Sequence, residues 1–258
     1  MATSWLRRSL LRHRGPTRPS SAPTQAGEPA AATDEKLWYL QQINIFADMT
    51  DAEMRRLAER TVMRRYPRGA VIAQQDDPAN VIYLVKEGRV KLCRYSPAGR
   101  VQILALLERG DLFGERGLVG TPAATHCEAF EDTLICVLRK EDFEDLVRSN
   151  PALALRVIRV LAERLRTAEE AIESLALQNV PVRLATLLRR LAEEYGEAHA
   201  LGRRLALRLT HHDLASMIGA SRETVTTLLN RLRDEGAIAI EDRHIIIRNP
   251  DRLHPHDG

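Results

Sequence analysis

The chain has few cysteines, no long apolar run and little excess charge, and each of these absences removes a class of protein. Its 258 residues contain three cysteines, Cys93, Cys127 and Cys136, and none of them forms a Cys-x-x-Cys pair. Because so sparse and odd a count suits a reducing compartment, we expect a cytoplasmic protein. No stretch of eighteen apolar residues is present, so no membrane span and no membrane partner are expected.

Sequence signatures of catalysis are missing as well. The chain has no Walker loop, no Gly-x-Ser-x-Gly, no His-Glu-x-x-His and no protein-kinase signature set. We therefore do not expect an enzyme, although an enzyme with a nucleotide-sensing domain is the competing class. The consecutive His211 and His212 have no cysteine pair nearby, so no metal site is expected from them.

Charge alone does not identify a partner. The formal net charge is +3, and residues 180–258 hold 12 arginines against 11 acidic residues. DNA binding must therefore be argued from where the arginines lie. Residues 1–33 are rich in Arg, Ser, Pro and Ala, and their first acidic residue is Glu28. This composition predicts a disordered basic tail, with a mis-assigned start codon and an organelle transit peptide as alternatives.

The segment from residue 66 to residue 129 has the pattern of an antiparallel β-domain. Short apolar runs alternate with glycines, at positions 69, 88, 99, 110, 114, 117 and 120. Residues 81–85 and 89–95 are expected to pair as a hairpin about Gly88, and further strands are expected at 101–107 and 133–138. Many short strands with such turns predict a barrel or sandwich.

A long helix is expected from Pro151, which suits a first helical turn, to about residue 178. Its apolar residues recur at steps of three and four: Val157, Leu161, Leu165, Ala168, Ile172 and Leu175. Charged residues, Arg164 among them, flank this row. The pattern predicts a coiled-coil seam and hence a homodimer; a helix packed on its own domain is the alternative. Residues 179–181 then form a hinge.

Residues 210–233 read as two short helices joined by a tight turn. Leu214, Ala215, Met217 and Ile218 give the first helix an apolar face, and Gly219 is expected to end it in a left-handed conformation. Ser221 is expected to cap the second helix. Val225, Leu228, Leu229 and Leu232 recur at helical spacing and are expected to face the core.

The start of the second helix then faces outward with Arg222, Glu223, Thr226 and Thr227. A helix presented in this way fits the DNA major groove, where Arg can bond a guanine edge and Glu can accept from cytosine. An ordinary helical hairpin with a solvated face is the alternative. The apolar runs at 237–240 and 244–248 flank a polar turn and predict the β-hairpin wing of a winged helix.

This order of elements resembles the cyclic-AMP receptor protein / fumarate-and-nitrate-reduction regulator (CRP/FNR) family of bacterial transcription factors. The resemblance rests on SRETVTTLLNRL at 221–232 and DLFGERGL at 111–118, and it covers about residues 38–250. It implies an α+β fold in four parts. These are the basic tail at 1–33, an N-terminal antiparallel β-roll of the cyclic-nucleotide-binding kind at 34–150, a dimerisation helix and hinge at 151–179, and a C-terminal winged helix-turn-helix at 180–258.

By resemblance, a homodimer reads an inverted repeat in double-stranded DNA, with Arg222 on guanine and Glu223 on cytosine. Thr227 stands where the cyclic-AMP receptor has a further arginine, so one base of the half-site is expected to differ. Thr210 and Ser221 are expected either to position phosphates or to cap helices. The resemblance also implies RNA polymerase as a partner. Activation or repression would depend on where the DNA site lies relative to a promoter.

The resemblance also places an effector site at Gly114, Glu115, Arg116, Gly117 and Leu118. Glu115 matches the glutamate that accepts from the ribose hydroxyl, but the arginine that pairs with the cyclic phosphate is missing and Thr125 falls in its place. The adenine-binding residues of the dimer helix correspond to Ala168 and Glu169. We therefore do not expect the family's usual control by cyclic AMP. The alternative is a cyclic-nucleotide-dependent regulator in which Arg116 replaces the missing arginine.

Other effectors of the family fit less well. Its iron–sulfur members carry N-terminal cysteines, whereas residues 1–92 here contain none. Its haem-sensing members use Cys and His ligands, but His126 and Cys127 are adjacent and should point to opposite faces of a strand. The sequence therefore does not establish a cofactor. Members controlled by their abundance alone also exist, and the altered effector site suits that interpretation.

Overall fold

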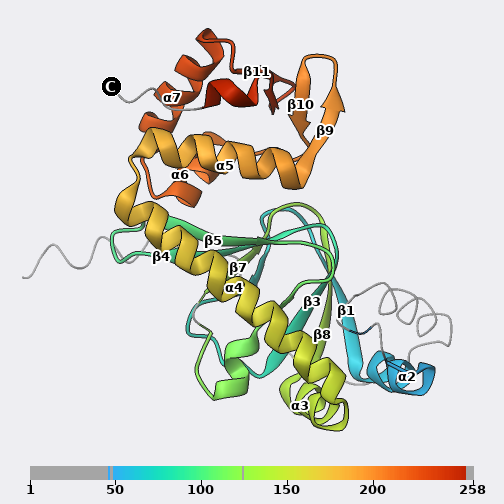
Figure 1. Ribbon diagram of the computed structural model, residues 1–258. Helices are drawn as coiled ribbons and strands as arrows, with labels where there is room; N and C mark the ends of the chain where they lie inside the picture. Colours follow the sequence, from blue (N-terminus) through green and yellow to red (C-terminus); the bar gives the residue numbers. More distant parts are fainter. Residues whose placement is uncertain (1–45, 47–48, 124, 254–258) are drawn as a thin grey trace, which may run out of the picture.

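The computed structural model describes residues 46, 49–123 and 125–253 as a β-roll, a long helix and a winged helix (Figure 1). The α+β architecture predicted from the sequence is confirmed. The basic tail predicted at residues 1–33 lies outside the described residues. Within the described part, no helix is both long and apolar enough to cross a membrane.

The β-roll consists of two four-stranded antiparallel sheets. One sheet has the order β1-β8-β3-β6 and the other β2-β7-β4-β5. Their strands are β1 (Thr61–Tyr66), β2 (Val71–Ala73), β3 (Val81–Glu87), β4 (Val90–Tyr95), β5 (Val101–Leu107), β6 (Leu112–Phe113), β7 (His126–Ala129) and β8 (Thr133–Arg139). Apolar side chains of both sheets, such as Val85, Val90 and Ile135, are fully buried. These residues form the core between the sheets.

The hairpin predicted for the two runs about Gly88 is wrong. β3 pairs with β6 and β8, whereas β4 pairs with β5 and β7 in the other sheet. The turn at Gly88 therefore carries the chain from one sheet to the other. Consecutive strands with a short turn look alike in sequence whether they pair or change sheet, because both arrangements alternate buried and exposed residues.

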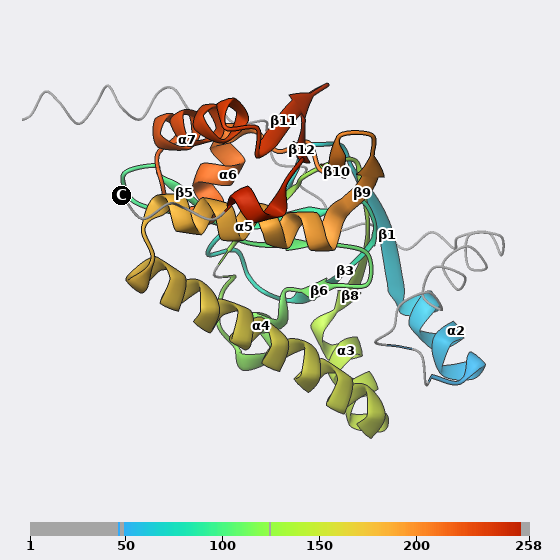
Figure 2. The same ribbon diagram turned by 45° about the horizontal axis from the view of Figure 1, so that its top comes forward.

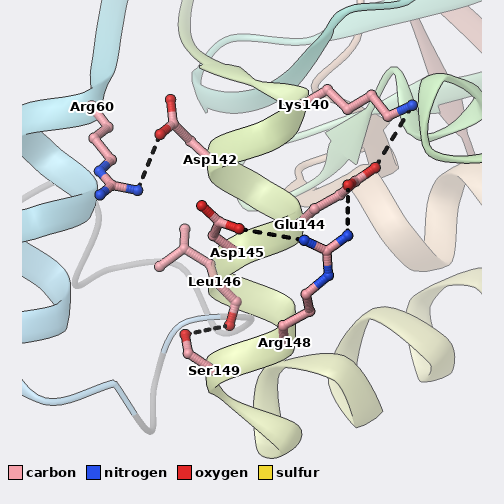
Figure 3. Close-up of polar contacts among 8 residues, drawn as sticks. All are labelled: Arg60, Lys140, Asp142, Glu144, Asp145, Leu146, Arg148 and Ser149. Carbon is pink, nitrogen blue, oxygen red and sulfur yellow. Dashed lines mark hydrogen bonds and ion pairs between the residues drawn. The ribbon is translucent and has the colours of Figure 1, made fainter.

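Two helices, α2 (Asp51–Arg60) and α3 (Lys140–Ser149), lie at the end of the β-roll away from the winged helix (Figure 1). Figure 3 shows how polar contacts hold them. Arg60 of α2 pairs with Asp142 of α3 at 3.1 Å. Within α3, Glu144 forms ion pairs with both Lys140 and Arg148. Because these pairs are partly exposed, they contribute little stability individually. The buried Met54, Leu57 and Phe143 anchor the two helices instead.

Helix α4 (Pro151–Leu177) begins at Asn150, whose side-chain oxygen accepts from the Leu153 N–H at 3.0 Å. The helix runs along the β-roll and ends beside the winged helix (Figures 1 and 2). Leu153 and Val157 are buried against their own domain. The apolar residues Ile158, Leu161, Leu165, Ile172 and Leu175 remain exposed.

One member of the predicted dimer seam lies on the other face of α4. Val157 is only 7% exposed and belongs to the β-roll core, whereas Leu165 and Ile172 are 61% and 66% exposed. Ile158 takes the place of Val157 in the exposed row, since 158, 161, 165, 168, 172 and 175 keep the steps of three and four. The sequence pattern admits both residues because α4 is apolar on two faces at its start.

The winged helix comprises α5 (Val180–Tyr195), β9 (Gly196–His199), β10 (Gly202–Leu205), α6 (His211–Ile218), α7 (Arg222–Asp234), β11 (Ile238–Glu241), β12 (His244–Ile247) and the short η3 (Pro250–Leu253). Its strands form one sheet in the order β11-β12-β10-β9. The predicted wing is the β11–β12 hairpin. Asp242 and Arg243 both adopt positive φ at its tip, as a two-residue primed turn requires. Strands β9 and β10 were not predicted from the sequence.

The winged helix packs directly on the β-roll of the same chain. Helix α6 lies against β5 (Figure 2). Phe130 of the β-roll is buried within the core cluster of the winged helix, and Leu106 of β5 packs against that cluster. The Arg89 guanidinium also lies over the Tyr195 ring, 5.3 Å from its centroid. The two domains therefore share an interface besides the hinge.

Candidate nucleic-acid interface and effector site

Both helices of the helix-turn-helix begin at side-chain caps. The Thr210 hydroxyl accepts from the Asp213 N–H at 3.0 Å, and Asp213 in turn accepts from the Thr210 N–H at 2.9 Å. The Ser221 hydroxyl accepts from the Thr224 N–H at 3.0 Å. These bonds satisfy backbone donors that a helix start leaves free. The structure thus gives Thr210 and Ser221 the capping role.

The turn between α6 and α7 depends on Gly219. This residue ends α6 with φ +63°, a left-handed conformation that costs glycine little. Its N–H donates to the carbonyl of Ala215. The predicted break at this position is confirmed. The turn sets the angle at which α7 leaves α6.

Helix α7 has one buried and one exposed face. Val225 and Leu229 are fully buried, and Leu228 and Leu232 pack against the same core, as the spacing predicted. Arg222, Glu223 and Thr227 are exposed. An open hollow beside the first turn of α7 is lined by Thr210, His211, His212 and Arg222. The polar residues of both helix starts therefore face one shared surface.

Two threonines of α7 use their hydroxyl groups within the protein. Thr227 donates to the Glu223 carbonyl at 3.1 Å. Thr226 donates to the Arg222 carbonyl at 2.9 Å, and its oxygen lies 2.8 Å from Nδ1 of His211. Thr226 is therefore half-buried between α6 and α7 rather than outward-facing like Arg222. From the sequence, His211 was considered only as a metal ligand, and this contact was not predicted.

Glu223 stays ionised at the exposed start of α7. Hydrogen bonds from its own backbone N–H and from the Ser221 hydroxyl lower the pKa of its carboxyl group. A carboxylate accepts hydrogen bonds only, so Glu223 can accept from a cytosine amine but cannot donate to a base. Beside it, Arg222 supplies donors only. Arg222 therefore suits a guanine edge and Glu223 a cytosine amine.

The residues predicted for an effector site form the short helix η2 (Glu115–Val119) and the loop before it. Gly117 is buried against the backbone of Ala79: a β-carbon built on it would lie 1.9 Å from the Ala79 carbonyl oxygen. Arg116 beside it is exposed. The glycine is thus explained by packing within the β-roll, whether or not a ligand binds.

Substitution of Gly117 tests that explanation. Gly117→Ala is expected to lower the free energy of unfolding by about 2–3 kcal/mol, because the β-roll must shift to admit a methyl group. Gly120→Ala is the matched control, since a β-carbon there meets nothing within 4 Å. The control should cost about 1 kcal/mol, from its left-handed φ of +71° alone. Urea unfolding of both variants measures this difference, and equal losses would contradict the packing role.

Arg164 of α4 is the cation that contacts this loop. Its guanidinium donates to the Leu112 carbonyl, and its nitrogens lie 3.7 Å from a Glu115 carboxylate oxygen and 3.9 Å from Asp111. One of its nitrogens, Nη1, is buried and makes no hydrogen bond. From the sequence, Arg164 was interpreted only as a charge flanking the seam. No signal in the spacing distinguishes it from Arg166, which pairs with Glu163 and Glu170 on the surface.

The loop fits a cyclic nucleotide poorly. Glu115, the expected acceptor for a ribose hydroxyl, already lies beside Arg164. Thr125, at the place of the missing phosphate-binding arginine, is half-buried with its hydroxyl 3.8 Å from the Cys127 sulfur. Thr125 offers no positive charge there. Arg116 is exposed to solvent, and Ala168 and Glu169 are exposed on α4.

His126 and Cys127 diverge, as adjacent residues on β7 should. Cys127 is buried in the β-roll core, and burial raises the pKa of its thiol to about 11. The His126 ring meets the Tyr95 ring edge-on, 5.1 Å between centroids. Among the described residues, no three His, Cys, Asp or Glu side chains converge as metal ligands would.

Sequence profiles of two known domain families match this chain. The cyclic nucleotide-binding domain matches residues 63–150, and the Crp-like helix-turn-helix domain matches residues 182–255. The first covers the strands of the β-roll and α3. The second covers the winged helix from α5 to beyond η3.

Individual relatives agree with the profiles. The cyclic AMP receptor protein of Thermus thermophilus is 36% identical over 187 residues, 72% of this chain and 83% of the relative. The global nitrogen regulator of Synechocystis is 32% identical over 192 residues, 73% of this chain and 85% of the relative. A solved transcriptional regulator of the CRP/FNR family from Thermus thermophilus has a TM-score of 0.63 at 28% identity, covering 74% of this chain and 96% of its own.

Proposed function

Because the chain belongs to the CRP/FNR family of DNA-binding transcription regulators, we propose that it acts as a homodimer that reads an inverted repeat with two copies of α7. The exposed first turn of α7 carries this proposal. There Arg222 and the ionised Glu223 stand together, held by the Ser221 cap on a helix whose other face is buried. Two such helices related by a two-fold axis read half-sites one helical turn apart.

We assign the DNA contacts as follows. Arg222 bonds guanine and Glu223 accepts from cytosine, while Thr227 can only accept from a base because its hydroxyl proton is used within α7. Thr210 and Ser221 lie at the edge of the same surface and approach phosphates while they cap their helices. Thr226 donates to the Arg222 carbonyl within α7 and does not contact a base.

We further propose that DNA binding does not need cyclic AMP. The phosphate-binding arginine is replaced by Thr125, and Arg164 already faces Glu115 across the loop. A buried anion without a paired cation costs several kcal/mol, so the loop would bind a cyclic phosphate weakly. The family contains transcription regulators rather than enzymes, and we propose no catalytic step. DNA and RNA polymerase in the cytoplasm are the partners proposed here.

Selection from a random duplex pool tests this function. The full chain is incubated with the pool in parallel, without ligand and with cyclic AMP. We expect the same inverted repeat in both arms, with a guanine for Arg222 and a cytosine for Glu223 on the complementary strands of each half-site. The half-site should differ from that of the cyclic-AMP receptor at the base facing Thr227.

The other outcomes are equally informative. A repeat recovered only with cyclic AMP would show that Arg116 or Arg164 supplies the missing charge, and independence from the nucleotide would be wrong. Recovery of no repeat in either arm would contradict ligand-free DNA binding. A repeat whose half-sites lack this guanine and cytosine would contradict the roles of Arg222 and Glu223.

A further inference from the structure

The turn between α6 and α7 is held from outside the helix-turn-helix. Gln102 of β5 donates from Nε2 to the Met217 carbonyl at 3.3 Å and to the neighbouring Ile103 carbonyl at 3.4 Å. Arg183 of α5 donates from Nε to the Ile218 carbonyl at 2.9 Å. Three structural elements thus meet at these two carbonyls: the β-roll, α5 and the end of α6.

These carbonyls need such partners. The last four carbonyls of a helix have no intrahelical donor and must find one elsewhere. Met217 and Ile218 are the last two residues of α6, and the chain turns sharply at Gly219. Side chains of Gln102 and Arg183 therefore complete the end of α6 from two sides.

The end of the dimer helix lies at the same turn. A β-carbon at Gly219 would lie 3.1 Å from Cδ2 of Leu175 and 3.5 Å from Oε1 of Gln102. Arg183 also donates from Nη1 to the Gln178 carbonyl at 2.7 Å, next to the hinge. One short turn therefore lies against α4 and strand β5, and Arg183 joins it to the residue just before the hinge.

We propose that Gln102 is a positioning residue for DNA recognition, which fixes the direction of α7 relative to α4 by binding the Met217 carbonyl. Only four residues lie between Met217 and Arg222. A shift of the turn therefore also moves the start of α7, which carries the proposed base contacts. Gln102 belongs to the β-roll, so this contact links the effector-like domain to the DNA surface without passing through the hinge. The inference rests on the proposed function, because its effect is felt only when two α7 helices bind one repeat.

The spacing of the two α7 helices matters only for the full repeat. Once one α7 has bound, binding of the second α7 is intramolecular. The effective concentration of the second α7 at its half-site falls when that helix points in the wrong direction. A duplex with one scrambled half-site engages a single α7 and is insensitive to that direction. The ratio of full-site to half-site affinity therefore isolates positioning from base contact.

The test uses the full chain with Gln102→Leu, which keeps the volume of the side chain but cannot donate to Met217. Gln102→Glu is a second variant of the same shape. Gln75→Leu and Gln75→Glu are the matched controls, at an exposed glutamine of the β-roll. Both Gln102 variants should lower full-site affinity about tenfold and leave half-site affinity unchanged, since each subunit loses the hydrogen bond to the Met217 carbonyl. Both controls should behave like the unaltered chain.

Hydrogen exchange of residues 215–224, measured without DNA, gives an independent readout. Exchange there should be faster in both Gln102 variants and unchanged in both controls. An unchanged affinity ratio would overturn the proposal, as would an unchanged exchange rate in the turn. If no variant and no control binds any repeat, the proposed function has failed, and the exchange rates alone then decide whether Gln102 holds the turn.

Discussion

Replacing Arg222 with alanine is expected to abolish sequence-specific DNA binding while the dimer stays intact. A bidentate arginine–guanine pair contributes about 1–3 kcal/mol of discrimination, and a two-fold dimer loses the pair twice. Affinity for the selected repeat should therefore fall by about 30-fold to 10⁴-fold. Affinity for unrelated duplexes should change little, because phosphate contacts dominate that binding. Titration of both duplexes at fixed salt measures the difference.

Arg233→Ala provides the matched control. Arg233 lies on the same helix, at its far end, and its guanidinium pairs with Asp234 at 3.3 Å. The substitution removes the same charge from α7 without removing the proposed guanine contact. Equal losses in the two variants would show that charge, rather than base reading, explains the effect. An Arg222→Ala protein that still prefers the selected repeat would refute the assignment.

Replacing Leu165 with glutamate is expected to convert the dimer into monomers. Leu165 is 61% exposed in the centre of the apolar row on α4, and burying one leucine contributes about 1.5–3 kcal/mol. Two copies are lost in a symmetric dimer, and two carboxylates then face each other. The dissociation constant should rise by about 10² to 10⁴-fold or more. Analytical ultracentrifugation across a range of concentrations measures the shift in mass.

Val62→Glu is the control for this variant, because Val62 is an exposed apolar residue of strand β1. It introduces the same charge but should leave the sedimentation mass unchanged. Circular dichroism should show that both variants keep their helix content. A Leu165→Glu chain that sediments as the unaltered chain does would place the dimer contact elsewhere. Loss of dimer in the Val62 control would lead to the same conclusion.

The helix-turn-helix was predictable because its signals are local. Gly219 must supply a left-handed residue and Ser221 a cap, and each acts within a few positions of its own place in the chain. Apolar spacing then assigned the buried face of α7 correctly. A motif of this kind can be read residue by residue, because each member of it constrains its neighbours directly.

The wrong and missed predictions concern features that have no such local signal. Whether β3 pairs with β4 depends on the path of the whole chain between two sheets, which a turn sequence does not encode. Strands β9 and β10 contain no β-branched residue and include two glycines, so their sequence shows no alternating apolar pattern. Arg164 resembles any surface charge of a long helix until the loop at Glu115 is placed beside it. The strand pairing of the β-roll and the position of Arg164 depend on tertiary contacts between distant segments, and β9 and β10 lack a local apolar pattern.

The burial of Phe130 in the core of the winged helix limits how this protein can be divided. A cut at the hinge would separate α5 and everything after it from the ring that fills part of its interior. The released piece would expose an apolar recess to water and would tend to aggregate. For the same reason, a foreign sensor domain could not simply be fused before Val180. A domain that replaces the β-roll must therefore supply an aromatic side chain to the same recess of the winged helix.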